Sequence, residues 1–347
     1  MKREKTKKRL RIVFTWLSWA VLIQFVLINI SAACYADKLT YLYTPDADTW
    51  TKPVSNNIFA KTWRLFTGPK FYRQTNSDTP HFAFTTLYLK TTKDLSIEAW
   101  YAKTDSTSKG TVILFHGLMG HKAHVMHEAG EFRQLGYHVM MVDVRGHGGS
   151  QGNRITLGFR ETEEVKLAYD HIARSGEKNI ILWGASMGAV EILKSIVDYD
   201  LKPSGIIIEM PFLSLESHLK GRARVLGFPE QPFAFLTSFW IGAERGFSGW
   251  GFKTTEYAKK VNCPVLMQYG EKDALVLRYE TDAIYQSIAS KDKKLVLYEY
   301  GGHKQFLQED PATWIREVDM FLKKIPNKEQ GISNHEVKAE LKTTSTS

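Results

Sequence analysis

The pattern of apolar and polar positions changes sharply along this chain. An apolar stretch from Ile12 to Ala36, interrupted only by small or uncharged polar residues, follows a strongly basic start. A helix that crosses the hydrocarbon core of a bilayer needs about 20 such residues, so the stretch is long enough to span one. Residues 37–80 then mix Pro, Thr, Asn, Asp and aromatic residues without a clear period. We expect them to form a connector that wraps onto a domain.

From His81 onward, the pattern predicts strands and helices in alternation. Residues 82–91 and 96–103 alternate in polarity around a short polar turn, which predicts a hairpin. Short apolar runs rich in β-branched residues then alternate with segments of helical period. The predicted strands are 111–115, 137–142, 179–183, 205–209, 264–269 and 294–298, and the predicted helices are 125–135, 161–173, 187–197, 277–289 and 311–323.

This alternation predicts the α/β class, with a mostly parallel, doubly wound sheet in a domain over residues 81–324. Strands that are buried on both faces read as continuous apolar runs, and such sheets are covered by helices on both sides. Residues 211–257 interrupt the alternation and are too long for a simple connection. Nine Phe and Trp residues lie between Pro211 and Phe252, so we expect an inserted helical cap. The polar tail, residues 325–347, is expected to be disordered.

Composition and charge exclude some classes of protein. The chain has 347 residues, of which 43% are hydrophobic and 24% charged, as in ordinary globular proteins. The net charge is +9, but residues 1–11 alone carry +6, which leaves +3 for the rest. A nearly neutral body with a basic head is not the footprint of a nucleic-acid partner. The two cysteines, Cys34 and Cys263, predict no disulfide framework.

The basic start and the apolar stretch predict export or membrane anchoring through residues 1–36. Left uncleaved, the segment would be an anchor with its N-terminus in the cytoplasm and the domain outside, on the periplasmic side or in the cell envelope of a bacterium. Two kinds of processing also remain open. Ser31–Cys34 resembles a lipoprotein site that would lipidate Cys34, although an aliphatic residue is usual at Ser31, and Cys34–Ala36 fits an ordinary signal-peptidase site.

Two segments match the pattern Gly-x-Ser-x-Gly, which is typical of a nucleophilic serine on a sharp strand-to-helix turn. They are residues 184–188, with Ser186 at the centre, and residues 148–152, with Ser150. The turn requires a strand before the serine and a helix after it, with glycines that allow strand and helix to approach closely. Only Ser186 has this context, because Ser150 lies between loop residues. We therefore predict Ser186 as the nucleophile and regard Ser150 as a chance match.

A serine attacks a carbonyl only if a base takes its proton and an acid orients the base. Asp273 follows the strand predicted at 264–269, and His303 follows the strand predicted at 294–298. The order Ser, Asp, His, each beyond the end of a strand, predicts Asp273 as the acid and His303 as the base. Glu271 is the competing acid. We prefer Asp273 because it lies farther beyond its strand, where the loop can turn inward.

The same chemistry needs donors for the negative oxygen of the tetrahedral intermediate. The backbone N–H of the residue after the nucleophile, Met187, is one predicted donor of this oxyanion hole. The second is the N–H of Leu118, in the loop that follows the strand predicted at 111–115.

Taken together, five motifs resemble the α/β-hydrolase superfamily, and within it the serine-aminopeptidase and monoglyceride-lipase-like hydrolases. The resemblance extends over roughly residues 81–324. It implies an enzyme that hydrolyses esters, thioesters, amides or lipids without a metal or another cofactor. The motifs are His116-Gly117, Asp143–Gly148, Gly184–Gly188, Gly270–Asp273 and Gly301–His303.

Three functions are compatible with these residues. The first is a serine hydrolase that cleaves small acyl esters or lipids through an acyl-enzyme. The second is a peptidase or amidase with the same triad, and the third is a non-catalytic binding protein, against which the complete triad argues. The aromatic residues of the cap favour apolar acyl substrates. They are expected to line an acyl pocket, to enter the interface of a bilayer or to form the core of the cap itself.

His121, His124 and His127 recur at three-residue spacing, which raises the question of a metal site. A zinc site needs further ligands in a tetrahedral arrangement. We expect a polar helix face beside the active site and no metal.

Overall fold

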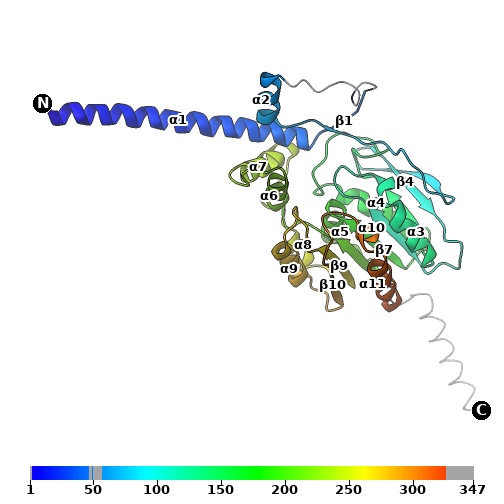
Figure 1. The fold of residues 1–347 in the computed structure, drawn as a ribbon. Coiled ribbons are helices and arrows are strands. Elements are labelled where there is room, and N and C mark those ends of the chain that lie inside the picture. Colours follow the sequence, from blue (N-terminus) through cyan, green and yellow to red (C-terminus); the bar gives the residue numbers. More distant parts are fainter. Residues whose placement is uncertain (1, 47–48, 50–56, 326–347) are drawn as a thin grey trace, which may run out of the picture.

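The computed structural model describes residues 2–46, 49 and 57–325 and contains an eight-stranded sheet (Figure 1). The strand order is β10-β9-β8-β7-β5-β6-β4-β3, in which all neighbours from β10 to β6 are parallel and β4 and β3 are antiparallel. The predicted α/β class with a mostly parallel sheet is confirmed. The strands are β3 (Thr85–Lys90), β4 (Ser96–Ala102), β5 (Thr111–Phe115), β6 (His138–Val142), β7 (Ile180–Ala185), β8 (Gly205–Glu209), β9 (Val265–Gly270) and β10 (Lys293–Tyr298).

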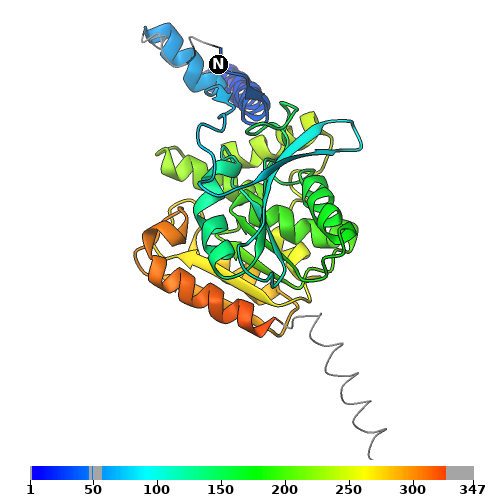
Figure 2. The ribbon, with the colours of Figure 1, turned by 90° about the vertical axis from the view of Figure 1, so that its right-hand side faces the viewer.

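Helices cover both faces of the sheet, because successive side chains of its buried strands point to opposite faces. In β5, Val112 and Leu114 join one core with α3 and α11, whereas Ile113 and Phe115 join a second core with α4, α5 and α9. Figure 2 shows α11 lying along the sheet at the end of the body opposite to the N-terminal helix. The helices are α3 (Met126–Gln134), α4 (Thr162–Arg174), α5 (Met187–Tyr199), α9 (Arg278–Ser287) and α11 (Pro311–Lys324), with short helices η1 (Lys122–Val125) and α10 (Phe306–Glu309).

The region between β8 and β9, expected to be a cap, contains α6 (Leu215–Val225), α7 (Phe233–Arg245) and α8 (Thr254–Ala258). Helices α6 and α7 pack against each other beside the sheet, whereas α8 packs between α5 and α9 as part of the body (Figure 1). Ser214 begins α6 with a capping box, in which its hydroxyl accepts the N–H of Ser217 and the Ser217 hydroxyl accepts the N–H of Ser214.

The N-terminal segment forms one long helix, α1 (Lys2–Leu39), which differs in its end from the segment expected over residues 1–36. Its large apolar side chains from Leu10 to Ile30 are exposed, except that of the half-buried Ile28, and the helix is long and apolar enough to cross a membrane. The last turns are buried in the body instead. The rings of Phe71 and Phe233 both contact the ring of Tyr35, and Ala32, Ala36 and Leu39 are fully buried. The apolar stretch thus ends as part of the hydrophobic core.

Residues 37–80 contain more structure than the expected connector. Strands β1 (Leu42–Tyr43) and β2 (Phe71–Tyr72) pair in parallel, and helix α2 (Ile58–Thr67) lies between them in sequence. The end of α2 is attached to α1: the Ser31 hydroxyl donates to the Phe66 carbonyl and the Lys38 ammonium to the Thr67 hydroxyl. Of the tail expected to be disordered, Ile325 is buried in the core, and residues 326–347 lie outside the described residues.

Two buried carboxyl groups lie close together where α3 packs on the sheet: those of Glu128 and Glu209. Glu128 on α3 is fully buried, and neither of its carboxyl oxygens has a hydrogen-bond partner within residues 2–46, 49 and 57–325. Burial and the nearby Glu209 raise the pKa of Glu128 to about 8. Glu209, at the end of β8, accepts hydrogen bonds from the Trp314 indole at 2.7 Å and the Gln268 amide at 3.1 Å, and burial raises its pKa to about 7.

We expect Glu128→Gln to reduce the pH dependence of stability. The folded protein holds the Glu128 proton up to about pH 8, whereas an unfolded chain releases it near its ordinary pKa of 4.5. The contribution to stability is therefore complete at pH 4 and is lost as the pH rises through 8, by an amount on the order of a few kcal/mol. Glutamine stays neutral, so the variant should lose less stability between pH 5 and 8.5 in denaturant unfolding in detergent micelles. The partly exposed Glu131→Gln on the same helix is the control, and equal pH slopes for both variants would contradict the prediction.

Candidate active site

Ser186 lies on a strained turn between β7 and α5. Its φ of 52° and ψ of −110° are unusual for a residue with a side chain. Two glycines make the turn possible. A Cβ on Gly184 would lie 2.6 Å from the Gly188 carbonyl carbon, and one on Gly188 would lie 2.4 Å from the Phe115 carbonyl oxygen. The start of α5 therefore packs directly on the end of β5, and the Ser186 side chain is held at that edge of the sheet.

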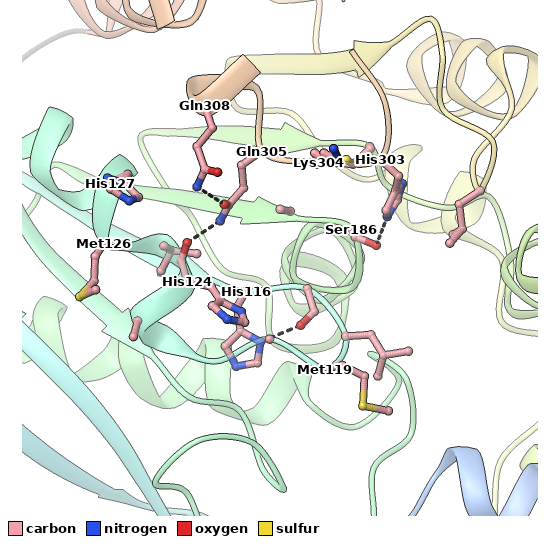
Figure 3. Close-up of a pocket in the computed structure, with 18 of the residues that line it drawn as sticks. His116, Met119, His124, Met126, His127, Ser186, His303, Lys304, Gln305 and Gln308 are labelled. Carbon is pink, nitrogen blue, oxygen red and sulfur yellow. Dashed lines mark hydrogen bonds between the residues drawn. The ribbon is translucent and has the colours of Figure 1, made fainter. Parts of the chain in front are cut away.

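The structure brings together the three residues that the sequence predicts as a triad. His303 Nε2 lies 3.0 Å from the Ser186 hydroxyl oxygen (Figure 3). On the other side of the ring, His303 Nδ1 lies 2.7 Å from Asp273 Oδ2. These distances suit a histidine that accepts the serine proton while its other nitrogen donates to a carboxylate. The three residues follow β7, β9 and β10, whose carboxyl ends meet at one edge of the parallel sheet.

The second carboxylate oxygen of Asp273 is held by the backbone. Its Oδ1 accepts the N–H groups of Leu275 at 2.7 Å and Val276 at 2.9 Å, so that Oδ2 is the oxygen that faces His303. Glu271, the competing acid, instead pairs with Arg278 on the outer side of the loop. The loop after β9 thus turns inward at Asp273.

The loop after β5 lies against Ser186, as the predicted oxyanion hole requires. A Cβ on Gly117 would lie 3.4 Å from the Ser186 Cβ, and Met119 adopts a positive φ of 61°. His116 holds this loop: its Nδ1 lies 2.8 Å from the Gly117 carbonyl oxygen, and its Nε2 accepts the Val144 N–H. Burial and the neighbouring His147 lower the pKa of His116 to about 3, so this side chain is neutral and acts in positioning the backbone.

Ser150, in the second Gly-x-Ser-x-Gly match, stabilises its loop by hydrogen bonds and lies away from His303. It is fully buried, donates to the Asp143 carbonyl at 2.6 Å and accepts the Glu98 N–H at 2.8 Å. The adjacent Asp143 carboxylate is paired with the buried Lys122 ammonium at 2.6 Å. Burial opposes ionisation of Asp143, but Lys122 outweighs it and lowers the pKa of this carboxyl. The loop that contains Ser150 is therefore tied to the sheet from within.

A cavity of about 650 Å³ opens over Ser186 and His303. Leu118, Met119 and Met126 contribute apolar surface to it. Its polar groups come from His124, His127, Lys304, Gln305 and Gln308 (Figure 3). None of the nine cap Phe and Trp residues, all of them described, lines this cavity. Of the three alternatives for these aromatics, the one in which they line an acyl pocket is not met at this cavity, to which the cap contributes His218 and Arg222.

The three histidines at three-residue spacing do not share one face of an α-helix. His121 precedes the 3-10 turn η1, His124 lies within it and His127 lies on α3. The ring centroids of His121 and His124 lie 3.8 Å apart with the ring planes tilted by 36°, and His124 and His127 line the cavity. Across the described ranges, no three His, Cys, Asp or Glu side chains form a group that could hold a metal.

His218 and Arg222 are cavity residues that the sequence reasoning did not identify. His218 is buried, and neither of its ring nitrogens has a hydrogen-bond partner in the described part of the chain; burial lowers its pKa. Arg222, one turn later on α6, stacks over the Phe71 ring at 5.3 Å and pairs with no described carboxylate. Their four-residue spacing at the start of the cap was the available signal, because it places both on one face of a helix.

Comparison with known proteins agrees with this architecture. Residues 106–240 match the family model described as serine aminopeptidase, S33. The lysophosphatidylserine lipase ABHD12 of Xenopus tropicalis is 28% identical over 196 residues, which cover 53% of this chain and 47% of that protein. The mouse protein of the same name is 27% identical over 191 residues, covering 52% and 45%. The chain thus spans about half the length of these relatives.

Solved structures with the same fold include two esterases. The structure of the Pyrococcus furiosus esterase Pf2001 has a TM-score of 0.62 and 22% sequence identity, and the alignment covers 73% of this chain and 96% of the esterase. The structure of the esterase EaEST from Exiguobacterium antarcticum has a TM-score of 0.53 and 16% sequence identity, and the alignment covers 69% of this chain and 100% of the esterase. At these identities the likeness establishes the fold, which is that of the α/β hydrolases.

We expect Asp273→Asn to slow the reaction of Ser186 with a fluorophosphonate by on the order of 10³–10⁴-fold. Because two backbone N–H groups hold position Oδ1, the asparagine oxygen should occupy it and its NH₂ should point at His303 Nδ1. The proton would then be forced onto Nε2, which could no longer accept the serine proton. Glu271→Gln is the matched control and should react at the wild-type rate. The acid assignment would be wrong if the two variants reacted equally fast.

Proposed function

We propose that this chain is a member of the α/β hydrolases, a membrane-anchored serine hydrolase that cleaves carboxylic esters of lipid-like substrates. The observation that carries the proposal is the hydrogen-bonded line from Ser186 through His303 to Asp273 at the floor of an open cavity. An activated serine with an adjacent cavity and oxyanion donors is the arrangement required for acyl transfer.

In the proposed mechanism, Ser186 attacks the substrate carbonyl carbon while His303 Nε2 accepts the hydroxyl proton. Asp273 keeps the second His303 proton on Nδ1 and stabilises the imidazolium that forms. The N–H groups of Leu118 and Met187 stabilise the negative oxygen of the tetrahedral intermediate. His303 then donates its proton to the leaving oxygen, which departs as an alcohol. Water hydrolyses the acyl-enzyme, again with His303 as base, and the acid product leaves.

The charges of the cavity favour a lipid with an anionic headgroup. Arg222 and Lys304 line it, whereas Asp78 is the one acidic residue among its described lining residues. Neither cation is paired with a carboxylate in the described ranges, so both are available to a phosphate or carboxylate of the substrate. The name of the relatives, lysophosphatidylserine lipase, describes a substrate of this chemistry. Leu118, Met119 and Met126 provide apolar surface for the acyl chain.

The N-terminal helix supports retention of the anchor. Cleavage after Ala36, or lipidation at Cys34 with loss of the preceding residues, would remove Ala32 from the core, and the former would also remove Tyr35 and Ala36. We therefore propose that α1 stays attached and spans the membrane. The basic residues of its N-terminus support an orientation with that end in the cytoplasm and the catalytic domain outside.

We expect Ser186→Ala to abolish both labelling of the detergent-solubilised full chain by a fluorophosphonate probe and turnover of a monoacyl lipid ester. The variant removes only the nucleophile, so its thermal unfolding should match that of the wild type. Ser150→Ala is the control. It should keep labelling and turnover, although loss of two buried hydrogen bonds should lower its melting temperature.

A panel of ester and amide substrates separates the two candidate activities. The alternative, a peptidase, is favoured only by the description of the matching family model. Faster turnover of aminoacyl amides than of acyl esters would support it over the lipase. A folded wild-type protein that neither reacts with the probe nor cleaves any substrate would contradict both and leave a non-catalytic binding role.

We expect Arg222→Gln to lower kcat/KM for a monoacyl lipid with a phosphate-containing anionic headgroup by about 10- to 100-fold. This range corresponds to the loss of one hydrogen-bonded contact to a charged group. Turnover of an uncharged monoacylglycerol should change little. Arg224→Gln is the control on the same helix, because Arg224 bonds Glu230 and the Ala274 carbonyl and does not line the cavity. An equal loss with both substrates would contradict headgroup recognition by Arg222.

A further inference from the structure

Large apolar side chains are exposed near the end of α1 as well as along it. Those on α1 run from Leu10 to Ile30, which at 1.5 Å per residue is about 30 Å, the thickness of the hydrocarbon core of a bilayer. Beyond Ile30 the helix enters the body, where α2 and α7 pack against it (Figure 1). These two helices therefore lie at the level where a membrane-spanning α1 would leave the hydrocarbon.

On the cap, aromatic rings form an exposed ridge that reaches α1. Phe235 and Phe239 are one turn apart on α7, and Trp250 stacks on Phe235 at 4.5 Å and contacts Phe239 at 5.2 Å. Each of the three is more than 40% exposed, and none lines the catalytic cavity. The Phe239 ring contacts Trp240, whose indole N–H lies 3.3 Å from the Asn29 side-chain oxygen on α1. The ridge is thus continuous with the end of the apolar part of α1.

Helix α2 presents a second apolar face. Ile58, Phe59 and Trp63 are exposed by 69%, 83% and 66%, the highest values for the described large apolar residues outside α1 except that of Tyr300. At 100° per residue they occupy one side of the helix, whereas Lys61 and Arg64 lie on the other. This segregation is typical of a helix that lies in the plane of a membrane interface. The hydrogen bonds of Ser31 and Lys38 to the end of α2 hold it beside α1.

We propose that these six residues form a membrane-docking surface that lies in the headgroup region of the same bilayer that α1 spans. The surface consists of Ile58, Phe59, Trp63, Phe235, Phe239 and Trp250. The bilayer is the occupant because α1 supplies it at this level, and because aromatic side chains are enriched at the depth where a membrane meets water. The proposal rests on the proposed retention of α1 as a membrane span and is independent of the catalytic triad.

Such docking constrains the body in a way that a single span does not. A lone helix with a free hinge would let the domain tilt and rotate over the membrane. Here α2 and α7 both pack against α1, and both would insert apolar side chains at its exit. The cap, which supplies His218 and Arg222 to the cavity, would then be held at the membrane surface.

The test places spin labels in the full chain reconstituted in nanodiscs of phosphatidylcholine and phosphatidylglycerol. In a Cys34→Ser, Cys263→Ser background, single cysteines replace Phe239, Trp63, Val21 and Met320. Collisions with oxygen, which concentrates in the bilayer, are compared with collisions with a water-soluble nickel chelate. Val21 lies in the middle of the apolar part of α1 and tests the premise of a span. Met320 lies on α11, a helix that is far from α1 in both ribbon views (Figures 1 and 2).

We expect oxygen collisions to exceed nickel collisions at positions 21, 63 and 239, and the reverse at 320. If position 21 is in the bilayer while 63 and 239 behave like 320, the docking surface is refuted and the anchor stands. Protection of 63 and 239 from both reagents would mean that protein covers them, which also refutes the proposal. All four labelled side chains are exposed, so the cysteine variants should fold like the unsubstituted protein. Circular dichroism checks this.

Discussion

The close contact between Gly188 and the Phe115 carbonyl is the constraint on which the rest of the site depends. With no side chain at position 188, α5 begins directly against the end of β5, and the Ser186 backbone is forced into its positive φ. The same contact places the loop after β5 within reach of the Ser186 side chain. Backbone packing therefore sets the positions of the proposed nucleophile and of the proposed oxyanion donors, and the loops after two further strands of the same sheet bring His303 and Asp273 to the site.

The sequence predicted the parts of the fold in which local pattern and burial agree. The strands at 111–115 and 205–209 match the predicted bounds, because strands buried on both faces leave an unbroken apolar run. Asp273 could be preferred to Glu271 from its place in the loop, since only a residue well beyond the end of the strand can reach the centre of the site. Helix α2 could not be predicted, because its end is held by Ser31 and Lys38, some 30 residues earlier in the chain.

Burial also explains what the sequence could not reveal about the cap. Its aromatic residues look alike in the sequence, but Phe212 and Phe252 are buried in the core, whereas Phe235 and Phe239 face outward. No periodicity distinguishes these groups, because the difference depends on where α7 meets α1. The cavity residues His218 and Arg222 were missed for a related reason. In the sequence, a polar pair on a helix looks like part of a solvent-exposed face, and only the tertiary structure shows that it faces the cavity.

The packing of α1 on the cap has a consequence for the order of biosynthesis. Asn29 and Trp240 are 211 residues apart, and the hydrogen bond between them joins the first helix to the second helix of the cap. The first helix to leave the ribosome therefore meets its partner only after some 200 further residues have been made, and such long-range closure is slow. If α1 is already in the bilayer, its C-terminal turns are kept at the membrane surface until α7 has been made. The domain would then fold against the membrane from the outset, with its nascent cap already at the membrane surface.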